Sequence, residues 1–301
     1  MKGLIDKIKL FINKENEIPI IPEGELYPKY FKNQEDIDFS PIFLLGGNRT
    51  GTSLTSSIVA QHPQLEGIFE SGDKKVNVSN TTGHTDSYCS SHHVWKHLAP
   101  LSDDWFNQNE GVLWGHPKHI SKYYRDKPKN KSEELFLANG IQSYRHTDKI
   151  PFINSHFNMF RIGLITKIFP NAKFIMTIRD FKDYIKSCYH KWSSQNINIE
   201  FPKIGLHWFT LNSCCLYDLK KYAPKNHCIV DYRSLFGNYN SVNKMLNKKL
   251  KHIGLDNFDF NLDSIKTSYR FLENKFIDEI EYSEIFEHLE SLISFENDIT
   301  S

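Results

Sequence analysis

The sequence has no hydrophobic run long enough to span a bilayer and no strong net charge. Its apolar stretches fall short of the roughly 20 residues that a transmembrane helix needs. Lys and Arg total 37 against 36 for Asp and Glu, so the charge balance does not favour nucleic acid or an anionic membrane as a partner. We therefore expect positive charge only locally, with no nucleic-acid partner and no integral membrane segment.

Cysteine is scarce and irregularly spaced. The five cysteines, at positions 89, 188, 214, 215 and 228, are odd in number and form no disulfide framework, which indicates reduced thiols and a cytoplasmic protein. A secretory signal is not expected, because Lys7, Lys9 and Lys14 interrupt the apolar positions of the N-terminus. The first 13 residues are amphipathic, and we interpret them as a short helix packed on the domain; contact with a membrane surface is the alternative.

The clearest pattern lies in residues 41–70. The apolar run IFLL over 42–45 predicts a buried parallel strand, and Leu54, Ile58 and Val59 are spaced as one face of a helix. The turn between them, GGNRTGTS over 46–53, has the G-x-x-x-x-G-x-[ST] spacing of a phosphate loop, in which backbone N–H groups and a helix N-terminus hold an anion. The lysine that ATPases and GTPases carry is missing, since Thr52 occupies its position, which argues against a kinase.

A second stretch, FPNAKFIMTIRDFKDYIKSCY over 169–189, predicts a buried strand over 173–178 followed by a helix. That helix carries Ser187, eight residues after Arg179. Together the two stretches resemble P-loop sulfotransferases, with their R-S-G-T-T-L loop and their F-P-x-A-K-F-I-x-x-x-R-D segment, and the motifs are closest to the tyrosylprotein sulfotransferase-like branch. The resemblance covers residues 42–70 and 149–235.

The resemblance implies a fold, a reaction and a set of binding residues. The fold would be α/β, with a P-loop-type central parallel sheet flanked by helices. Residues 1–40 would form an N-terminal helix and an extended lead-in, and 41–301 a single domain with a loop- and helix-rich insertion, 71–148, on the acceptor side. The reaction would be sulfuryl transfer from 3′-phosphoadenosine 5′-phosphosulfate (PAPS) to a hydroxyl, without a metal. The cofactor-binding residues would be Gly47, Asn48, Arg49, Thr50, Gly51, Thr52, Ser53, Arg179 and Ser187.

Three residues are expected to act on the reacting groups. Arg49 and Lys149 would stabilise charge on the departing bisphosphate; Lys149 lies in a segment that resembles the family's K-x-P element. Glu70 lies 21 residues after Arg49, at the offset of the proposed general base in the tyrosylprotein branch. A positioned carboxylate can speed proton removal by roughly 10²–10⁴. His116 is the reserve for this base, and ordinary surface roles are the alternative for Lys149 and Glu70.

Three further patterns are weaker. The segment 264–270 lies where the family often has a cofactor-covering loop, so Lys266, Ser268 and Arg270 could touch phosphate. A cluster of Cys89, His92, His93 and His97 includes a helical His pair, but no second ligand element accompanies it, so we expect no metal site. The segment 230–235 resembles the family's x-x-Y-E-D-L strand end, with Arg233 where an acid is usual, and we expect only the local ion pairs to change.

The acceptor is inferred from composition alone. Aromatic side chains in 71–148, such as Trp95, Trp105 and Trp114, suit stacking on sugar rings, which favours a carbohydrate or glycosylated metabolite; simple core positions are the alternative. A peptide tyrosine is the second acceptor. Two other classes of function stay open: a P-loop kinase or NTP-binding protein that needs Mg²⁺, and a non-catalytic protein that keeps the nucleotide site. The oligomeric state is not predicted.

Overall fold

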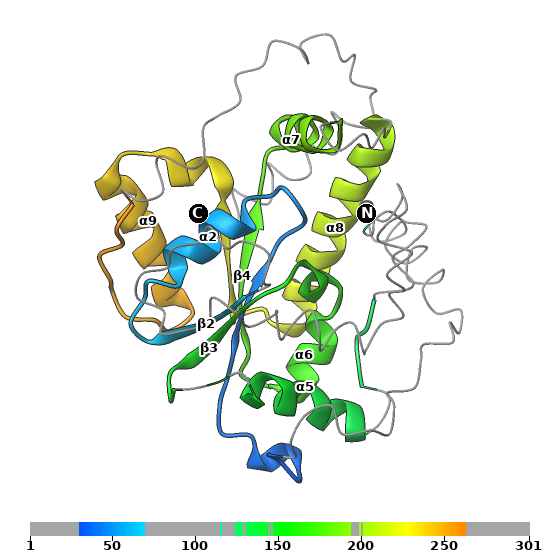
Figure 1. Ribbon diagram of the computed structural model, residues 1–301, viewed down its shortest axis with the longest axis vertical. Coiled ribbons are helices and arrows are strands. Elements are labelled where there is room, and N and C mark those ends of the chain that lie inside the picture. Colours follow the sequence, from blue (N-terminus) through cyan, green and yellow to red (C-terminus); the bar gives the residue numbers. More distant parts are fainter. Residues whose placement is uncertain are drawn as a thin grey trace.

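A parallel sheet forms the centre of the molecule (Figure 1). The computed structural model describes residues 30–69, 115, 124–128, 131–143, 145, 147–193, 199 and 201–262. Within them, the strands are β1 (Ile42–Leu45), β2 (Leu65–Phe69), β3 (Ile150–Asn154), β4 (Lys173–Ile178) and β5 (His227–Asp231). Their order is β2-β3-β1-β4-β5, and all pairs are parallel. The turn after β1 therefore lies at the middle of the carboxyl edge of the sheet.

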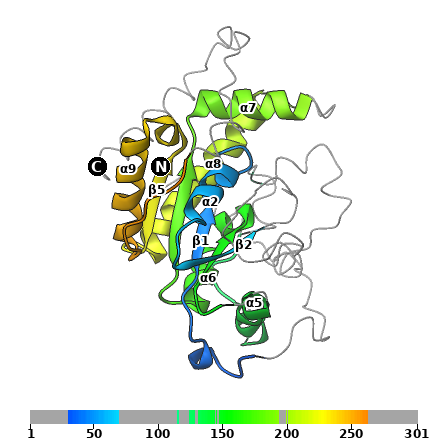
Figure 2. The ribbon, with the colours of Figure 1, turned by 60° about the vertical axis from the view of Figure 1, so that its left-hand side comes forward.

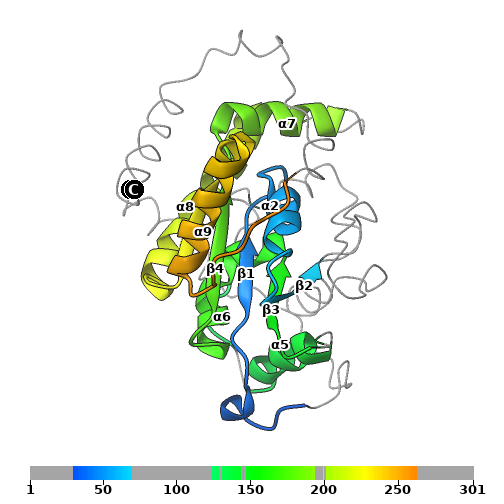
Figure 3. The ribbon, with the colours of Figure 1, turned by 90° about the vertical axis from the view of Figure 1, so that its left-hand side faces the viewer.

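Helices cover both faces of this sheet. Along the described chain they are η1 (Gln34–Asp36), α2 (Thr52–Val59), α5 (Lys131–Ser143), η4 (His156–Phe160), α6 (Ile162–Ile168), α7 (Phe181–Ser193), α8 (Phe201–Tyr222), η5 (Tyr232–Phe236) and α9 (Tyr239–His252). Figure 3 looks onto the face that α2 and α9 cover, and α5, α6 and α8 pack on the other face. None of the described helices is long and apolar enough to cross a bilayer.

Strand β1 shows how the sequence sorts side chains between the two faces. Ile42 and Leu44 pack in the core that contains α2 and α9, whereas Phe43 and Leu45 pack in the core that contains α6 and α8. All four side chains are at most 1% exposed. A central parallel strand covered on both faces is continuously apolar in this way, so the prediction of a buried strand is confirmed.

The second predicted strand and helix are also confirmed. The strand over 173–178 is β4, and the helix that carries Ser187 is α7. The apolar spacing over 154–169 predicts one continuous helix, and this prediction is wrong, because Asn154 ends β3 and the chain then forms the separate helices η4 and α6, which meet at Arg161. β3 itself was not predicted. It is short, and Pro151 has no N–H to donate to the sheet, which argues against an interior strand.

Other expectations fall on residues outside the described part of the chain. These are the N-terminal helix, most of the 71–148 insertion and the cofactor-covering segment 264–270. The assignment of 41–301 to a single domain stays a prediction. Of the five cysteines, four are described, and each is a buried free thiol.

Side-chain amides hold the segment 258–261 in place. Asn243 of α9 accepts from the N–H of Phe260 at 2.8 Å and donates to its carbonyl at 3.3 Å. Asn247 makes the same pair of bonds with Phe258, at 2.7 and 2.8 Å. Buried backbone groups need such partners wherever no strand or helix supplies them. The chain after α9 is therefore fixed to that helix by amide pairs.

Replacing Asn243 by alanine should lower the free energy of unfolding by about 2 kcal/mol, because it removes the amide from two buried backbone groups of Phe260. Asn240→Ala, at an exposed position of the same helix, is the matched control and should change stability by less than about 0.5 kcal/mol. Urea denaturation of both variants measures the difference. Equal stability would show that the amide pair does not hold this segment.

Candidate functional site

The turn between β1 and α2 is held by its own hydrogen bonds and by β4. Thr50 donates to the carbonyl of Gly47 through both its backbone N–H, at 3.2 Å, and its hydroxyl, at 2.8 Å. Thr177 of β4 donates its hydroxyl to the carbonyl of Leu45 at 3.0 Å. Helix α2 then begins at Thr52, with Gly51 as an N-cap that offers no side-chain hydrogen bond and with no acidic residue in its first turn. The positive end of the helix is thus open to an anion, as in phosphate loops.

Gly51 is required at the end of this turn for two reasons. Its φ of +99° is in the left-handed region that side chains disfavour. A Cβ at this position would also lie 2.1 Å from Cδ2 of Tyr232, so the tyrosine ring packs directly on the loop backbone. The same ring lies under Arg179, whose guanidinium carbon is 4.4 Å from the ring centroid. Tyr232 therefore joins the loop to the end of β4.

Two arginines and a serine meet beside the turn. Arg49 Nε donates to Ser187 Oγ at 3.1 Å, and Arg179 Nη1 donates to the carbonyl of Arg49 at 3.0 Å. Figure 2 shows the loop after β1 lying below α7, the helix that carries Ser187. The three residues form a cationic corner, the name used below, at the carboxyl edge of the sheet.

The cationic corner fits an anion. The Nε of Arg179 is buried and has no hydrogen-bond partner among the described residues. Burial lowers the pKa of Arg179, and the neighbouring Arg49 lowers it further, so each cation would be stabilised by a negative ligand. A buried donor without a partner is costly, and a phosphate oxygen forms strong charge-assisted bonds with such a group.

The structure therefore brings together the loop residues 47–53, Arg179 and Ser187, as the motifs predicted. The indole N–H of Trp208 donates to the carbonyl of Arg179 at 3.0 Å and holds the end of β4. No pattern in the sequence pointed to Trp208, and for the segment 230–235, which contains Tyr232, we expected only a change of local ion pairs. Tyr232 is the tyrosine of the motif-like segment 230–235. Its packing on Gly51 depends on the fold and could not be predicted from the sequence.

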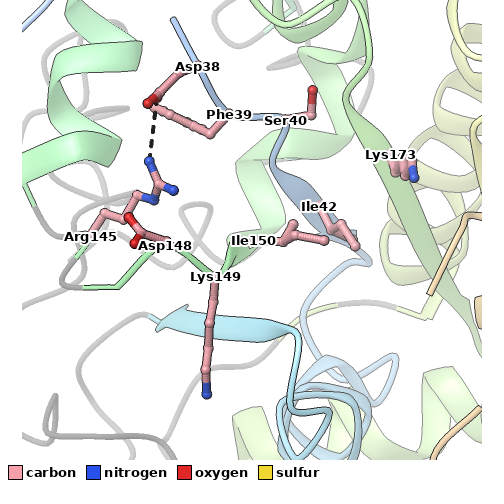
Figure 4. A pocket seen from close by; sticks show the side chains of 9 residues that line it. All are labelled: Asp38, Phe39, Ser40, Ile42, Arg145, Asp148, Lys149, Ile150 and Lys173. Atoms are coloured by element: carbon pink, nitrogen blue, oxygen red, sulfur yellow. Dashed lines mark ion pairs between the residues drawn. The ribbon is translucent and has the colours of Figure 1, made fainter. Parts of the chain in front are cut away.

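Lys149 is not brought to this corner. It precedes β3, at the amino end of that strand. Because Leu44 pairs with Asn154, the start of the loop at Gly46 lies level with position 156, which is seven residues after Lys149. Seven residues of extended chain span about 23 Å along the strands. It is exposed at the amino edge, beside a cavity of 210 Å³ (Figure 4). There Arg145 pairs with Asp38 at 3.5 Å, and the Lys149 side chain points away from both. The K-x-P resemblance thus assigned Lys149 to the wrong end of a strand that had not been recognised.

The candidate bases lie outside the described residues. β2 ends at Phe69, which pairs with Asn154 of β3, and the described chain stops one residue before Glu70. His116 and the cluster around Cys89 also lie outside it. Within the described part of the chain, no group of three His, Cys, Asp or Glu side chains is placed to hold a metal ion.

A family model described as the sulfotransferase family matches residues 41–259, well over half of the chain. This protein belongs to the sulfotransferase family. The matched region includes both motifs of the cationic corner. A sulfotransferase is a transferase enzyme, and the match does not single out the tyrosylprotein-like branch, which stays a hypothesis drawn from the motifs. No curated protein sequence matches the chain.

Solved sulfotransferase structures resemble the protein at low identity. A sulfotransferase from Mycobacterium tuberculosis is 15% identical, with 78% of this chain and 72% of the other covered and a TM-score of 0.46. The sulfotransferase domain of a Synechococcus olefin synthase is 16% identical over 77% and 79% of the two chains, with a TM-score of 0.42. A sulfotransferase domain of the curacin biosynthetic pathway is 14% identical over 85% and 98%, with a TM-score of 0.45. These values are too low to carry an argument about the acceptor.

Gly51→Ala should lower the free energy of unfolding by more than about 2 kcal/mol, because the alanine methyl would meet the Tyr232 ring and a left-handed alanine is itself strained. Gly237→Ala is the matched control, since Gly237 has a φ of −71° and a Cβ there would meet nothing closer than 3.5 Å. Thermal unfolding of both variants measures the effect. A Gly51→Ala protein as stable as the Gly237→Ala control would contradict the packing described for Tyr232.

Proposed function

We propose that the protein transfers a sulfuryl group from PAPS to a hydroxyl acceptor. The observation that carries this proposal is the cationic corner beside an uncapped helix N-terminus, with the buried Nε of Arg179 left without a partner in the described chain. Family membership supplies the reaction class. The corner supports a donor that carries two separate anionic groups, as PAPS does.

Each part of the donor has a matching part of the site in this proposal. The backbone N–H groups of residues 47–53 and the start of α2 would hold the 5′-phosphosulfate. Arg179 and Ser187 would hold the 3′-phosphate, and Arg49, a loop residue that contacts both of them, can serve both anions. Each hydrogen bond to a charged group contributes about 1.5–3 kcal/mol, so loss of Arg179 would be felt directly in binding.

The proposed chemical step is an in-line displacement at sulfur. The acceptor oxygen forms a bond to sulfur while the bond from sulfur to the bridging oxygen breaks, and its electron pair leaves with adenosine 3′,5′-bisphosphate. Arg49 would stabilise the charge that develops on this bridging oxygen, a contribution of about 3–4 kcal/mol for one preorganised contact. Glu70 is the proposed base that takes the acceptor proton. The charge is met by arginine and amide groups, so the step as proposed uses no metal.

For the acceptor we propose a carbohydrate or a glycosylated metabolite, on the strength of the aromatic composition of 71–148. Peptide tyrosine is the alternative that an acceptor screen with labelled PAPS would reveal. The buried free thiols of the described cysteines support a cytoplasmic location as part of the same proposal.

Calorimetric titration with adenosine 3′,5′-bisphosphate should give micromolar binding that Arg179→Ala weakens about 10- to 100-fold, because the variant loses charge-assisted bonds to the 3′-phosphate. Lys149→Ala is the control, because the register of β3 places that ammonium at the opposite edge of the sheet, and its affinity should stay within about twofold. Preference for ATP with Mg²⁺, or an affinity that Arg179→Ala does not change, would contradict this proposal and favour a P-loop kinase instead.

A further inference from the structure

Two carboxylates lie next to the cationic corner. Asp180 follows Arg179 directly, and Asp183 lies on the first turn of α7, between Arg179 and Ser187 in sequence. Asp180 has a structural task, because its carboxylate accepts from the N–H of Asp183 at 3.1 Å and so caps the helix. Acidic residues are favourable at a helix N-terminus. At this place, however, their charges oppose the binding of a phosphate.

Arg233 pairs with both of these carboxylates. Its Nη2 lies 3.2 Å from Oδ1 of Asp180, and its Nε donates to Oδ2 of Asp183 at 3.1 Å. The hydrogen bond with Asp183 raises the pKa of Arg233, as expected for a cation held between acids. Its side chain is 53% exposed, so these pairs contribute little to folding stability. The main effect of these ion pairs is therefore to offset the negative charge of Asp180 and Asp183.

The backbone around Arg233 aims it at α7. Asp231 ends β5 and accepts from the N–H of Arg233 at 2.9 Å, which caps the short helix η5. The preceding residue, Tyr232, carries Arg179 on its ring. Two consecutive residues of η5 thus serve the same corner, one by packing and one by charge.

We propose, resting on the PAPS function argued above, that Arg233 is a positioning residue that neutralises Asp180 and Asp183 and thereby makes the cationic corner selective for a 3′-phosphate. Asp183 lies within electrostatic reach of Arg179, since it raises the pKa of that arginine. Without Arg233, the charge of Asp183 would act unopposed on Arg179, and a bound phosphate would meet the repulsion of both carboxylates. Arg233, which stands where the family usually has an acid, thus has a role in ligand discrimination.

The test compares two ligands that differ only in the 3′-phosphate, adenosine 3′,5′-bisphosphate and adenosine 5′-monophosphate, by calorimetry at low salt. Arg233→Gln should weaken binding of the bisphosphate about tenfold and that of the monophosphate less than twofold. Arg233→Lys keeps the charge and should stay within about threefold of wild type. Lys248→Gln is the matched control, because it removes an exposed positive charge that lies on α9, and it should change neither affinity.

A double-mutant cycle separates charge compensation from direct contact with the ligand. If Arg233 acts by neutralising Asp183, Arg233→Gln in an Asp183→Asn background should cost less than about threefold in bisphosphate affinity. A full tenfold loss in that background would overturn the inference, as would equal weakening of both ligands by Arg233→Gln. If the wild-type protein itself does not distinguish the two ligands, the proposed PAPS function fails, whatever Arg233 does.

Discussion

The packing of the Tyr232 ring between the loop backbone and Arg179 is the contact on which the site depends. It joins three segments that are far apart in sequence, because Gly51 follows β1, Arg179 follows β4 and Tyr232 follows β5. The parallel register brings the carboxyl ends of these three strands to one edge, and β1 and β4 are direct neighbours there. Any shift of β5 against β4 would move the ring away from both partners.

This arrangement also explains how two arginines are held close together. Arg49 and Arg179 repel one another, and burial adds to the cost of keeping Arg179 charged. The aromatic face of Tyr232, the charge of Asp183 and the carbonyl of Arg49 offset part of that cost. The remaining positive charge is what a dianionic ligand would use. The site is thus preorganised for an anion by packing and by partial compensation of charge.

The sequence was sufficient for the elements whose signals are local. The segments 42–59 and 173–193 each combine a strand, a turn and a helix, so a local pattern in each segment was enough to predict them. Lys149 shows where such reasoning fails. A short motif does not reveal whether it begins or ends a strand, and only the pairing of β3 with β1 places this residue at the amino edge. The contact of Tyr232 with Gly51 depends likewise on the packing of distant segments, which no local pattern encodes.

In the proposed function, the cationic corner recognises a phosphate at the 3′ position rather than negative charge in general. The most direct measurement is the ratio of dissociation constants for adenosine 3′,5′-bisphosphate and adenosine 2′,5′-bisphosphate, two isomers of identical charge. Because Arg179 and Ser187 are fixed by β4, α7 and Tyr232, we expect the 3′,5′ isomer to bind at least about tenfold more tightly, which corresponds to about 1.4 kcal/mol. Equal affinities would contradict the account and would reduce the corner to a general binding surface for polyanions.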